Sequence, residues 1–149
     1  MSHKQYKGLY IHYTINMAYH FNTLITGVAS IEDLKSKISA SGSLNYKEDD
    51  HHIIIFSINN QRTGVELDDS TKSVIIEKET MTPIASQFNK LIYNEDAKEF
   101  LNGKNWGNVS VKYCFEGTMI VVFFSHGNWY VCTRKCLDAR KSFWIKDIS

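Results

Sequence analysis

The spacing of apolar residues predicts a short helix that starts at Ser30 and ends near residues 41–42. Serine at an N-cap accepts a hydrogen bond from a backbone N–H of the first turn, and the acidic residues at 32 and 33 favour the positive end of the helix dipole. The preceding segment, Leu9–Val28, has no clean period, and both a helix and a strand stay open there. The apolar positions of the predicted helix recur three and four residues apart, at Ile31, Leu34 and Ile38.

Apolar runs between turn residues predict strands in the middle of the chain. The run His52–Ile58 lies between paired aspartates and paired asparagines, which predicts a buried strand. Thr63–Leu67 and Ser73–Ile76 alternate on either side of an Asp-Asp-Ser turn, which predicts a hairpin. Pro83 is expected to stop the second strand of this hairpin. Histidines 51 and 52 are expected to cap an exposed strand end.

The second half of the chain predicts short helices followed by antiparallel strands. The helices are expected at Ile84–Ile92 and Glu95–Leu101, with a further helical segment over Asp138–Trp144. A tight turn at residues 125–128 is expected to join the last two strands. The three predicted strands are Val109–Tyr113, Thr118–Phe124 and Trp129–Thr133. Together the elements predict an α+β fold, an antiparallel sheet with short helices packed against it.

Composition narrows the class of protein and its partners. The chain has 149 residues, of which 43% are hydrophobic and 22% charged, and it is expected to form a single domain over residues 1–149. Its formal net charge of +1 provides no global field for nucleic acid or anionic membrane, so an anion site must depend on a few local basic residues. A signal peptide and a membrane span are not expected.

The cysteines indicate the compartment. There are three, at positions 114, 132 and 136, without a paired Cys-x-x-Cys pattern. Free thiols in a reducing compartment fit this count, so we expect an intracellular, cytoplasmic protein. The four-residue spacing of the last two and the lack of further ligands argue against zinc, and no metal site is expected from them.

One stretch has a pattern with chemical content, a strand followed by an acidic-Gly turn and a hairpin. Residues 112–118 are Lys-Tyr-Cys-Phe-Glu-Gly-Thr, and the hairpin ends in Thr-Arg-Lys at 133–135. Residues 62–68 (Arg-Thr-Gly-Val-Glu-Leu-Asp) and 83–89 (Pro-Ile-Ala-Ser-Gln-Phe-Asn) precede it. In this order the elements resemble the motifs of ATP-dependent RNA ligases of the bacteriophage and large-DNA-virus type, within the covalent nucleotidyltransferase superfamily. The ligase-like elements span about residues 53–144.

The resemblance implies a fold, cofactors and site residues. It implies a partial adenylation-domain fold, ATP and Mg²⁺ as cofactors, and a nucleotide or an RNA end as partner. In this family a lysine amine attacks the α-phosphorus of ATP and then passes AMP to a 5′-phosphate. Lys112 is the candidate nucleophile and Glu116 the residue that orders the site. The residues implied for phosphate binding are Arg62, Gly117, Arg134 and Lys135.

The sequence departs from the family pattern at two lysine positions and in length. Cys114 occupies the motif lysine position, and Lys112 lies two residues earlier, on the same face of a strand and about 6.6 Å away. Ser86 occupies the second lysine position, and Lys90 follows one helical turn later if the segment is helical. The later strands of the family would lie beyond residue 149. The chain is therefore expected to be either a fragment of a longer protein or a remnant that no longer does the chemistry.

Two functions stay open at this point. The first is an RNA ligase-like nucleotidyltransferase domain that binds ATP or a nucleic-acid end, either active or catalytically impaired. The second is a non-catalytic interaction or assembly module, a viral pseudoenzyme in the host cytoplasm or virion, with a protein partner. Convergence of Lys112, Glu116, Arg62 and Arg134 on one pocket would favour the first. Aromatic residues such as Phe123, Phe124 and Trp129 are expected to be core or partner-facing, with base stacking as the alternative.

Overall fold

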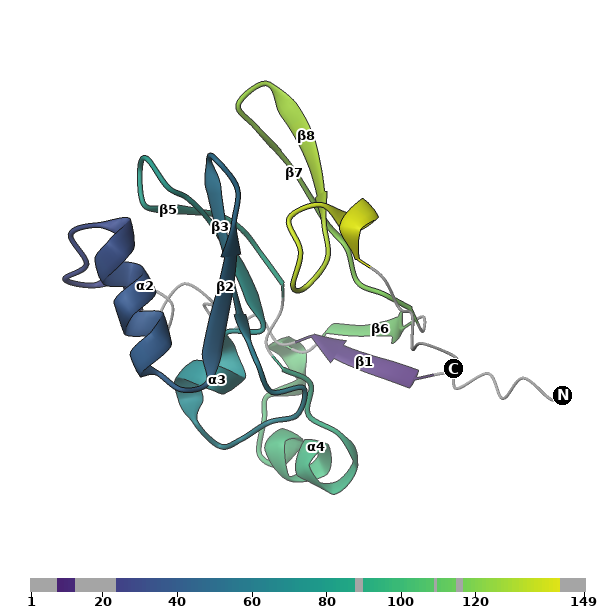
Figure 1. Ribbon diagram of the computed structural model, residues 1–149. Helices are drawn as coiled ribbons and strands as arrows, with labels where there is room; N and C mark the ends of the chain where they lie inside the picture. The colour runs from purple at the N-terminus through teal and green to yellow at the C-terminus, as the bar shows by residue number, and fades with distance from the viewer. Residues whose placement is uncertain (1–7, 13–23, 88–89, 109, 115–116, 143–149) are drawn as a thin grey trace, which may run out of the picture. The chain divides into compact units, whose positions relative to one another are not determined.

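The computed structural model describes residues 8–12, 24–87, 90–108, 110–114 and 117–142 (Figure 1). Contacts divide the chain into two compact units. The larger unit comprises residues 17–91 and 119–149, and the smaller comprises residues 1–16 and 92–118. Within the described ranges, none of the helices has the length and apolar character that a membrane crossing needs.

A four-stranded antiparallel sheet forms the centre of the larger unit. Its strand order is β2-β3-β4-β5, so that each strand pairs with its neighbour in sequence. The sheet confirms the predicted α+β class and the antiparallel arrangement. The bounds of the strands are Leu44–Glu48 for β2, His52–Ser57 for β3, Ser73–Glu77 for β4 and Thr82–Ser86 for β5.

Helix α2, Ile31–Ala40, covers one face of this sheet (Figure 1). The Ser30 hydroxyl accepts a hydrogen bond from the backbone N–H of Asp33 at 3.1 Å, which confirms the predicted N-cap. Leu34 and Ile38 are fully buried against the sheet. Their partners in this core layer are Leu24, Leu44, Ile53, Ile55, Val74 and Ile76.

A β-hairpin covers the other face of the sheet. Its strands are β7, Val121–Ser125, and β8, Asn128–Cys132. The two turn residues, at 126 and 127, have φ angles of 45° and 75°, as a two-residue hairpin turn requires. Phe123 and Cys132 pack with Ile54, Phe56 and Ile75 of the sheet. The larger unit therefore has three layers, and β3 is buried on both faces, which explains its continuous apolar run.

The smaller unit contains a two-stranded sheet and a helix. Strand β1, Gly8–His12, pairs antiparallel with β6, Ser110–Cys114. Helix α4, Asn94–Leu101, confirms the helix predicted at Glu95–Leu101, and a 3₁₀ turn follows at Trp106–Asn108. β6 thus takes its partner from the start of the chain, whereas β7 pairs with β8.

The segment between residues 63 and 86 differs from its prediction. Residues Glu66–Ser70 form helix α3, where a strand and turn were predicted, because Asp68 and Asp69 are drawn inward by buried partners. Pro83 does not end a strand but lies within β5, an edge strand that pairs on one side only, and edge strands are where proline is tolerated in a sheet. The helix predicted over Ile84–Ile92 is therefore wrong over residues 84–87 and 90–92, and residues 88–89 lie outside the described ranges.

Three further elements differ in part from their predictions. β2 was not predicted, because Leu44 is its single buried residue and the alternation is weak. The hairpin strands are confirmed, although β7 starts at Val121 rather than at residue 118. A 3₁₀ turn at Ala139–Lys141 stands in the segment predicted to be helical, of which residues 143–144 lie outside the described ranges.

The two cysteines of the hairpin region should differ sharply in reactivity. Cys132 is fully buried, and burial raises the pKa of its thiol to about 12, whereas Cys136 is half-buried; both are free. In a Cys114→Ser background at pH 8, we expect the Cys132 thiol to react with a maleimide about 1,000-fold more slowly than an ordinary thiol. Mass spectrometry after timed labelling measures the rates at which Cys132 and Cys136 are labelled. Equal rates in the native protein would contradict this packing, and equal rates in urea provide the control.

Candidate functional site

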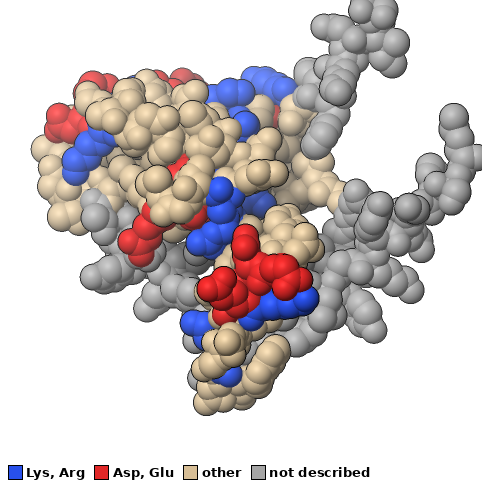
Figure 2. Space-filling view, turned by 90° about the horizontal axis from the view of Figure 1, so that it is seen from below, with Lys and Arg blue, Asp and Glu red and all other residues tan. Residues whose placement is uncertain are grey.

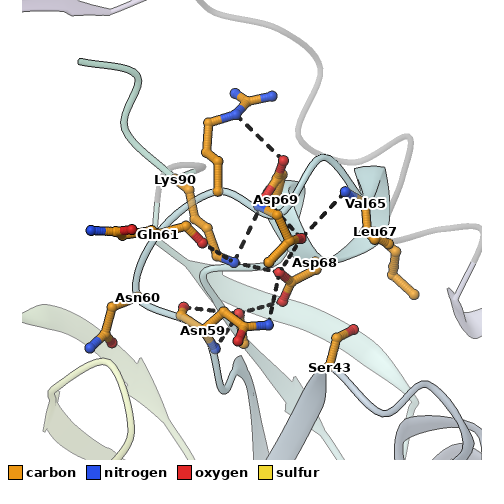
Figure 3. Close-up of polar contacts among 12 residues, drawn as sticks. Ser43, Asn59, Asn60, Gln61, Val65, Leu67, Asp68, Asp69 and Lys90 are labelled. Atoms are coloured by element: carbon orange, nitrogen blue, oxygen red, sulfur yellow. Dashed lines mark hydrogen bonds and ion pairs between the residues drawn. The ribbon is translucent and has the colours of Figure 1, made fainter. Parts of the chain in front are cut away.

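A group of hydrogen-bonded polar side chains, most of them buried, lies where β3 ends and α3 begins (Figure 3). We call it the Asp68 cluster, after its central carboxylate. The ammonium of Lys90 lies 2.6 Å from Asp68 Oδ2 and 3.7 Å from Asp69 Oδ1, with both Lys90 and Asp68 side chains almost fully buried. Its members are Ser57, Asn59, Thr63, Asp68, Asp69 and Lys90.

Each carboxylate of the Asp68 cluster is supplied with donors from its own chain. Asp68 Oδ2 accepts from the Thr63 hydroxyl at 2.7 Å and from the Asn59 amide at 3.2 Å, while Oδ1 accepts from the Ser57 hydroxyl. Asp69 accepts hydrogen bonds from the backbone N–H groups of residues 63 and 64, at 2.8 and 3.0 Å. Lys90 also donates to the carbonyl of residue 61 at 3.0 Å. Burial of these charges is tolerated because each one is paired and hydrogen-bonded.

The protonation state of Asp68 follows from these contacts. Burial would raise the pKa of Asp68, but the hydrogen bonds from Lys90, Ser57, Thr63 and Asn59 outweigh it, so that the pKa lies below its usual range. The carboxylate is therefore charged at neutral pH. Its charge holds Lys90 and the segment 57–69 in place.

Arg134, a predicted phosphate ligand, fastens the segment after β8 to the loop after β3. Its Nη2 donates to the carbonyls of Ser57 at 2.6 Å and Asn59 at 3.1 Å, and Nη1 donates to the side chain of Asn60 at 2.9 Å. Burial lowers the pKa of Arg134, and the charge of Asp68 partly offsets this effect. The guanidinium is thus engaged with three groups of its own chain.

The other predicted phosphate ligands have different surroundings. Arg62 is half-exposed, and its Nε lies 3.4 Å from Asp69 Oδ2. Lys135 is exposed, with its ammonium 5.7 Å from the centre of the Phe56 ring. Burial and the charges of Arg134 and Lys47 lower the pKa of Lys135. Gly117 is exposed. Arg62, which lies within the segment 57–69, and Arg134, which lies outside it, therefore both have partners in that segment.

The predicted nucleophile belongs to the smaller unit. Lys112 lies on β6 opposite Tyr10 of β1, and Cys114 lies two residues further along the same strand. Glu116 lies outside the described residues. The convergence of Lys112 and Glu116 with Arg62 and Arg134 therefore stays a prediction. Lys90, noted as a substitute for the lysine missing at Ser86, contacts Asp68 instead.

A chain of polar contacts ties the hairpin turn to the turn between β2 and β3. The fully buried His52 ring has its Nδ1 3.2 Å from Asp49 Oδ1 and its Nε2 2.9 Å from the Ser125 hydroxyl. The expectation that both histidines cap an exposed strand end is therefore wrong for His52. Phe123 and Tyr130 close around its ring. The link was invisible in the sequence because 73 positions separate His52 from Ser125.

A shallow hollow of about 310 Å³ lies beside this link. It is lined by Asp50, His51, Lys78, Glu79 and His126. The ring of His51 stacks on that of His126 at 4.2 Å, and His126 Nε2 lies 2.9 Å from a carboxylate oxygen of Glu77. Both histidines of the hollow are therefore already in contact with side chains of their own chain.

The carboxylates of the Asp68 cluster do not fit the Mg²⁺ that the resemblance implies. In the part of the chain that the structure describes, no group of three or more His, Cys, Asp or Glu is placed to hold a metal ion. Asp68 and Asp69 direct their oxygens at Lys90 and at donors of their own segment. On the face in Figure 2, Lys and Arg side chains lie among Asp and Glu side chains, in keeping with the net charge of +1.

The outward side of the β7–β8 hairpin has a different character. Its four side chains form two cross-strand pairs, Val122 with Val131 and Phe124 with Trp129. They are exposed by 53%, 43%, 59% and 71% respectively, and the two aromatic rings lie 5.4 Å apart. We call these four residues the outer hairpin face. The inward side, which contains Phe123 and Cys132, is buried against the sheet.

No protein-family model matches this chain. Searches of curated proteins and of solved structures find no match either.

Proposed function

We propose that this chain is a non-catalytic interaction module that binds a protein partner through the outer hairpin face. The observation that carries the proposal is the contiguity of four exposed apolar side chains on two neighbouring strands. Single exposed apolar residues are ordinary on a protein surface, whereas a contiguous group marks an interaction site. Trp129 and Phe124 also belong to the aromatic class that is enriched at protein interfaces.

The residue pattern of the hairpin supports the same function. A strand that faces water on one side alternates apolar and polar residues. β7 instead begins Val-Val-Phe-Phe, and β8 contains Trp-Tyr-Val-Cys, so both sides of the hairpin are apolar. This pattern is typical of strands that are covered on both faces. One cover is the four-stranded sheet, and a partner supplies the other.

The engagement of the basic residues supports a non-catalytic role. Arg62 and Arg134 are the arginines that the ligase resemblance assigns to phosphates. Arg62 pairs with Asp69, and Arg134 donates to two backbone carbonyls and one amide. A phosphate would have to replace these contacts in order to bind, and that replacement reduces the affinity.

Site-specific photo-crosslinking tests the proposed function. A photoreactive phenylalanine analogue at Val131 should crosslink, in cells that produce the full chain, to a polypeptide of one discrete mass. The same analogue at Asn45, an exposed position on β2, is the matched control and should give no such product. Trp129→Glu should abolish the Val131 product. Equal crosslinking from both positions, or none from Val131, would refute the proposal.

A second candidate is binding of a nucleotide or an RNA end. It is supported by the ligase-like motifs and by the gathering of Arg62 and Arg134 at the segment 57–69. Incubation with labelled ATP and Mg²⁺ tests its catalytic form, which predicts a covalent AMP adduct that Lys112→Ala removes. A rise in melting temperature with ATP tests binding alone. Absence of both effects would leave the interaction module as the function.

A further inference from the structure

We infer that the partner of the outer hairpin face is a second copy of this chain, with two β7–β8 hairpins packed face to face about a two-fold axis. The inference rests on the proposed function and identifies its partner. Three properties of the face carry it: its charge, the arrangement of large and small side chains, and its area.

The outer hairpin face has no charged side chain at any of its four positions. The face itself therefore gives no preference to a partner that carries charge. An apolar surface is complementary to another copy of itself, and a two-fold dimer requires that the same surface serve on both sides. Closed two-fold dimers are also the commonest soluble assemblies.

The side chains are arranged so that two copies can interdigitate. The aromatic pair, Phe124 and Trp129, lies next to the turn, and the smaller pair, Val122 and Val131, lies further from it. A two-fold axis that lies in the interface, parallel to the face and perpendicular to the strands, and passes between the two pairs sets the aromatic pair of one copy on the valine pair of the other. Large side chains then face small ones, which fills the layer without steric overlap.

Packing of this kind completes the layers of the larger unit. In one copy the order is α2, the four-stranded sheet and the hairpin, with the outer hairpin face uncovered. In the dimer the second hairpin covers the first at the ordinary spacing of about 10 Å between packed sheets. Every apolar side chain of β7 and β8 then has a neighbouring layer.

The available area sets the expected strength. Met119 and Ile120, which precede β7, are exposed by 40% and 54% and adjoin the face in the chain. With them, the apolar surface amounts to on the order of 500 Å² in each copy, or about 1,000 Å² in the pair, which is the lower end for a specific interface. We therefore expect a dissociation constant on the order of 1–100 μM.

Sedimentation equilibrium of the full chain between about 1 and 300 μM tests the inference. The expected mass rises from 17.2 kDa toward twice that value. Trp129→Glu and Phe124→Glu should each weaken the dimer at least 100-fold, since each would bury a charge without a partner. Tyr93→Glu, at an exposed aromatic of the smaller unit, is the matched control and should leave the dimer unchanged. Trp129→Ala, with a weaker effect in the same direction, covers the case in which a glutamate variant does not fold.

The possible outcomes separate this inference from the proposed function. In the purified chain, the photoreactive analogue at Val131 should give one product at twice the monomer mass, and this outcome supports the inference. A chain that stays monomeric over the whole range, while the same analogue yields a discrete product of another mass in cells, overturns the inference and leaves the proposed function standing. Absence of any product in either setting overturns both. A dimer that persists in Trp129→Glu also overturns the inference.

Discussion

Replacement of Lys90 by methionine is expected to lower the free energy of unfolding by about 3–5 kcal/mol. The variant keeps a side chain of similar length but leaves the Asp68 carboxylate buried without its counter-charge. The remaining donors, the Ser57 and Thr63 hydroxyls and the Asn59 amide, do not neutralise that charge. Urea unfolding followed by tryptophan fluorescence measures the change. Small domains are stable by about 5–15 kcal/mol, so a large share of the stability is at stake.

Two further variants show whether the buried charge is the cause. Lys98→Met removes one partner of a largely exposed ion pair with Glu95, and it should cost less than about 0.5 kcal/mol. Adding Asp68→Asn to Lys90→Met removes the uncompensated charge while it keeps an acceptor for the hydroxyls, and should restore at least half of the loss. If Lys90→Met costs no more than Lys98→Met, the Asp68 cluster is not a buried ion-paired unit.

The pH dependence gives an independent check. The pKa of Asp68 is lowered in the folded protein, so the pair contributes stability above the unfolded pKa of about 3.9 and loses it as the pH falls through the folded value. In Lys90→Met, burial of the lone carboxylate should instead raise its pKa. The difference between the two proteins should therefore be largest near pH 7 and shrink toward pH 4, where Asp68 of the variant is protonated.

Local patterns predicted those elements whose signals lie close together in the sequence. Ser30 and the spacing of Leu34 and Ile38 were sufficient for α2, and the turn residues at 125–128 were sufficient for the last hairpin. In both cases the partner groups lie within a few residues of one another. The sheet class followed from the same short-range signals.

The remaining errors arose where distant residues decide the outcome. Asp68 and Asp69 have the composition of a turn, and they lie in α3 because Lys90, 22 and 21 positions away, supplies a buried charge. A proline usually ends a strand, but Pro83 is tolerated in β5 because that strand lies at the sheet edge. Pairing across such distances leaves no periodic pattern in the sequence.

The candidate site shows the same limit. The resemblance implied Arg62 and Arg134 as phosphate ligands, and arginine suits bidentate contacts with anions. The partners observed are Asp69 and the carbonyls of the loop after β3, which no local motif indicates. Phe124 and Trp129 were expected to be core or partner-facing; they are exposed and so are not core residues, and a partner for them stays a prediction.

The three-layer order makes a second strong prediction, at two adjacent residues of β3. Ile54 and Ile55 are both fully buried, but Ile54 packs on the hairpin side of the sheet and Ile55 packs on the α2 side. Ile54→Ala and Ile55→Ala should each lower the free energy of unfolding by about 2–5 kcal/mol, through lost apolar burial and the cavity left behind. Ile58→Ala, at a half-exposed position just beyond β3, should cost less than about 1 kcal/mol.

Hydrogen exchange distinguishes the two core variants beyond their similar cost. Loss of Ile54 removes contacts with Phe123 and Cys132 and should speed exchange in β7 and β8 more than in α2. Loss of Ile55 removes contacts in the layer of Leu34 and Ile38 and should have the reverse effect. The same change in both layers for each variant would contradict a sheet that separates two cores. Because the outer hairpin face depends on a hairpin held in place from behind, Ile54→Ala should also weaken self-association, whereas Ile55→Ala should leave it nearly unchanged.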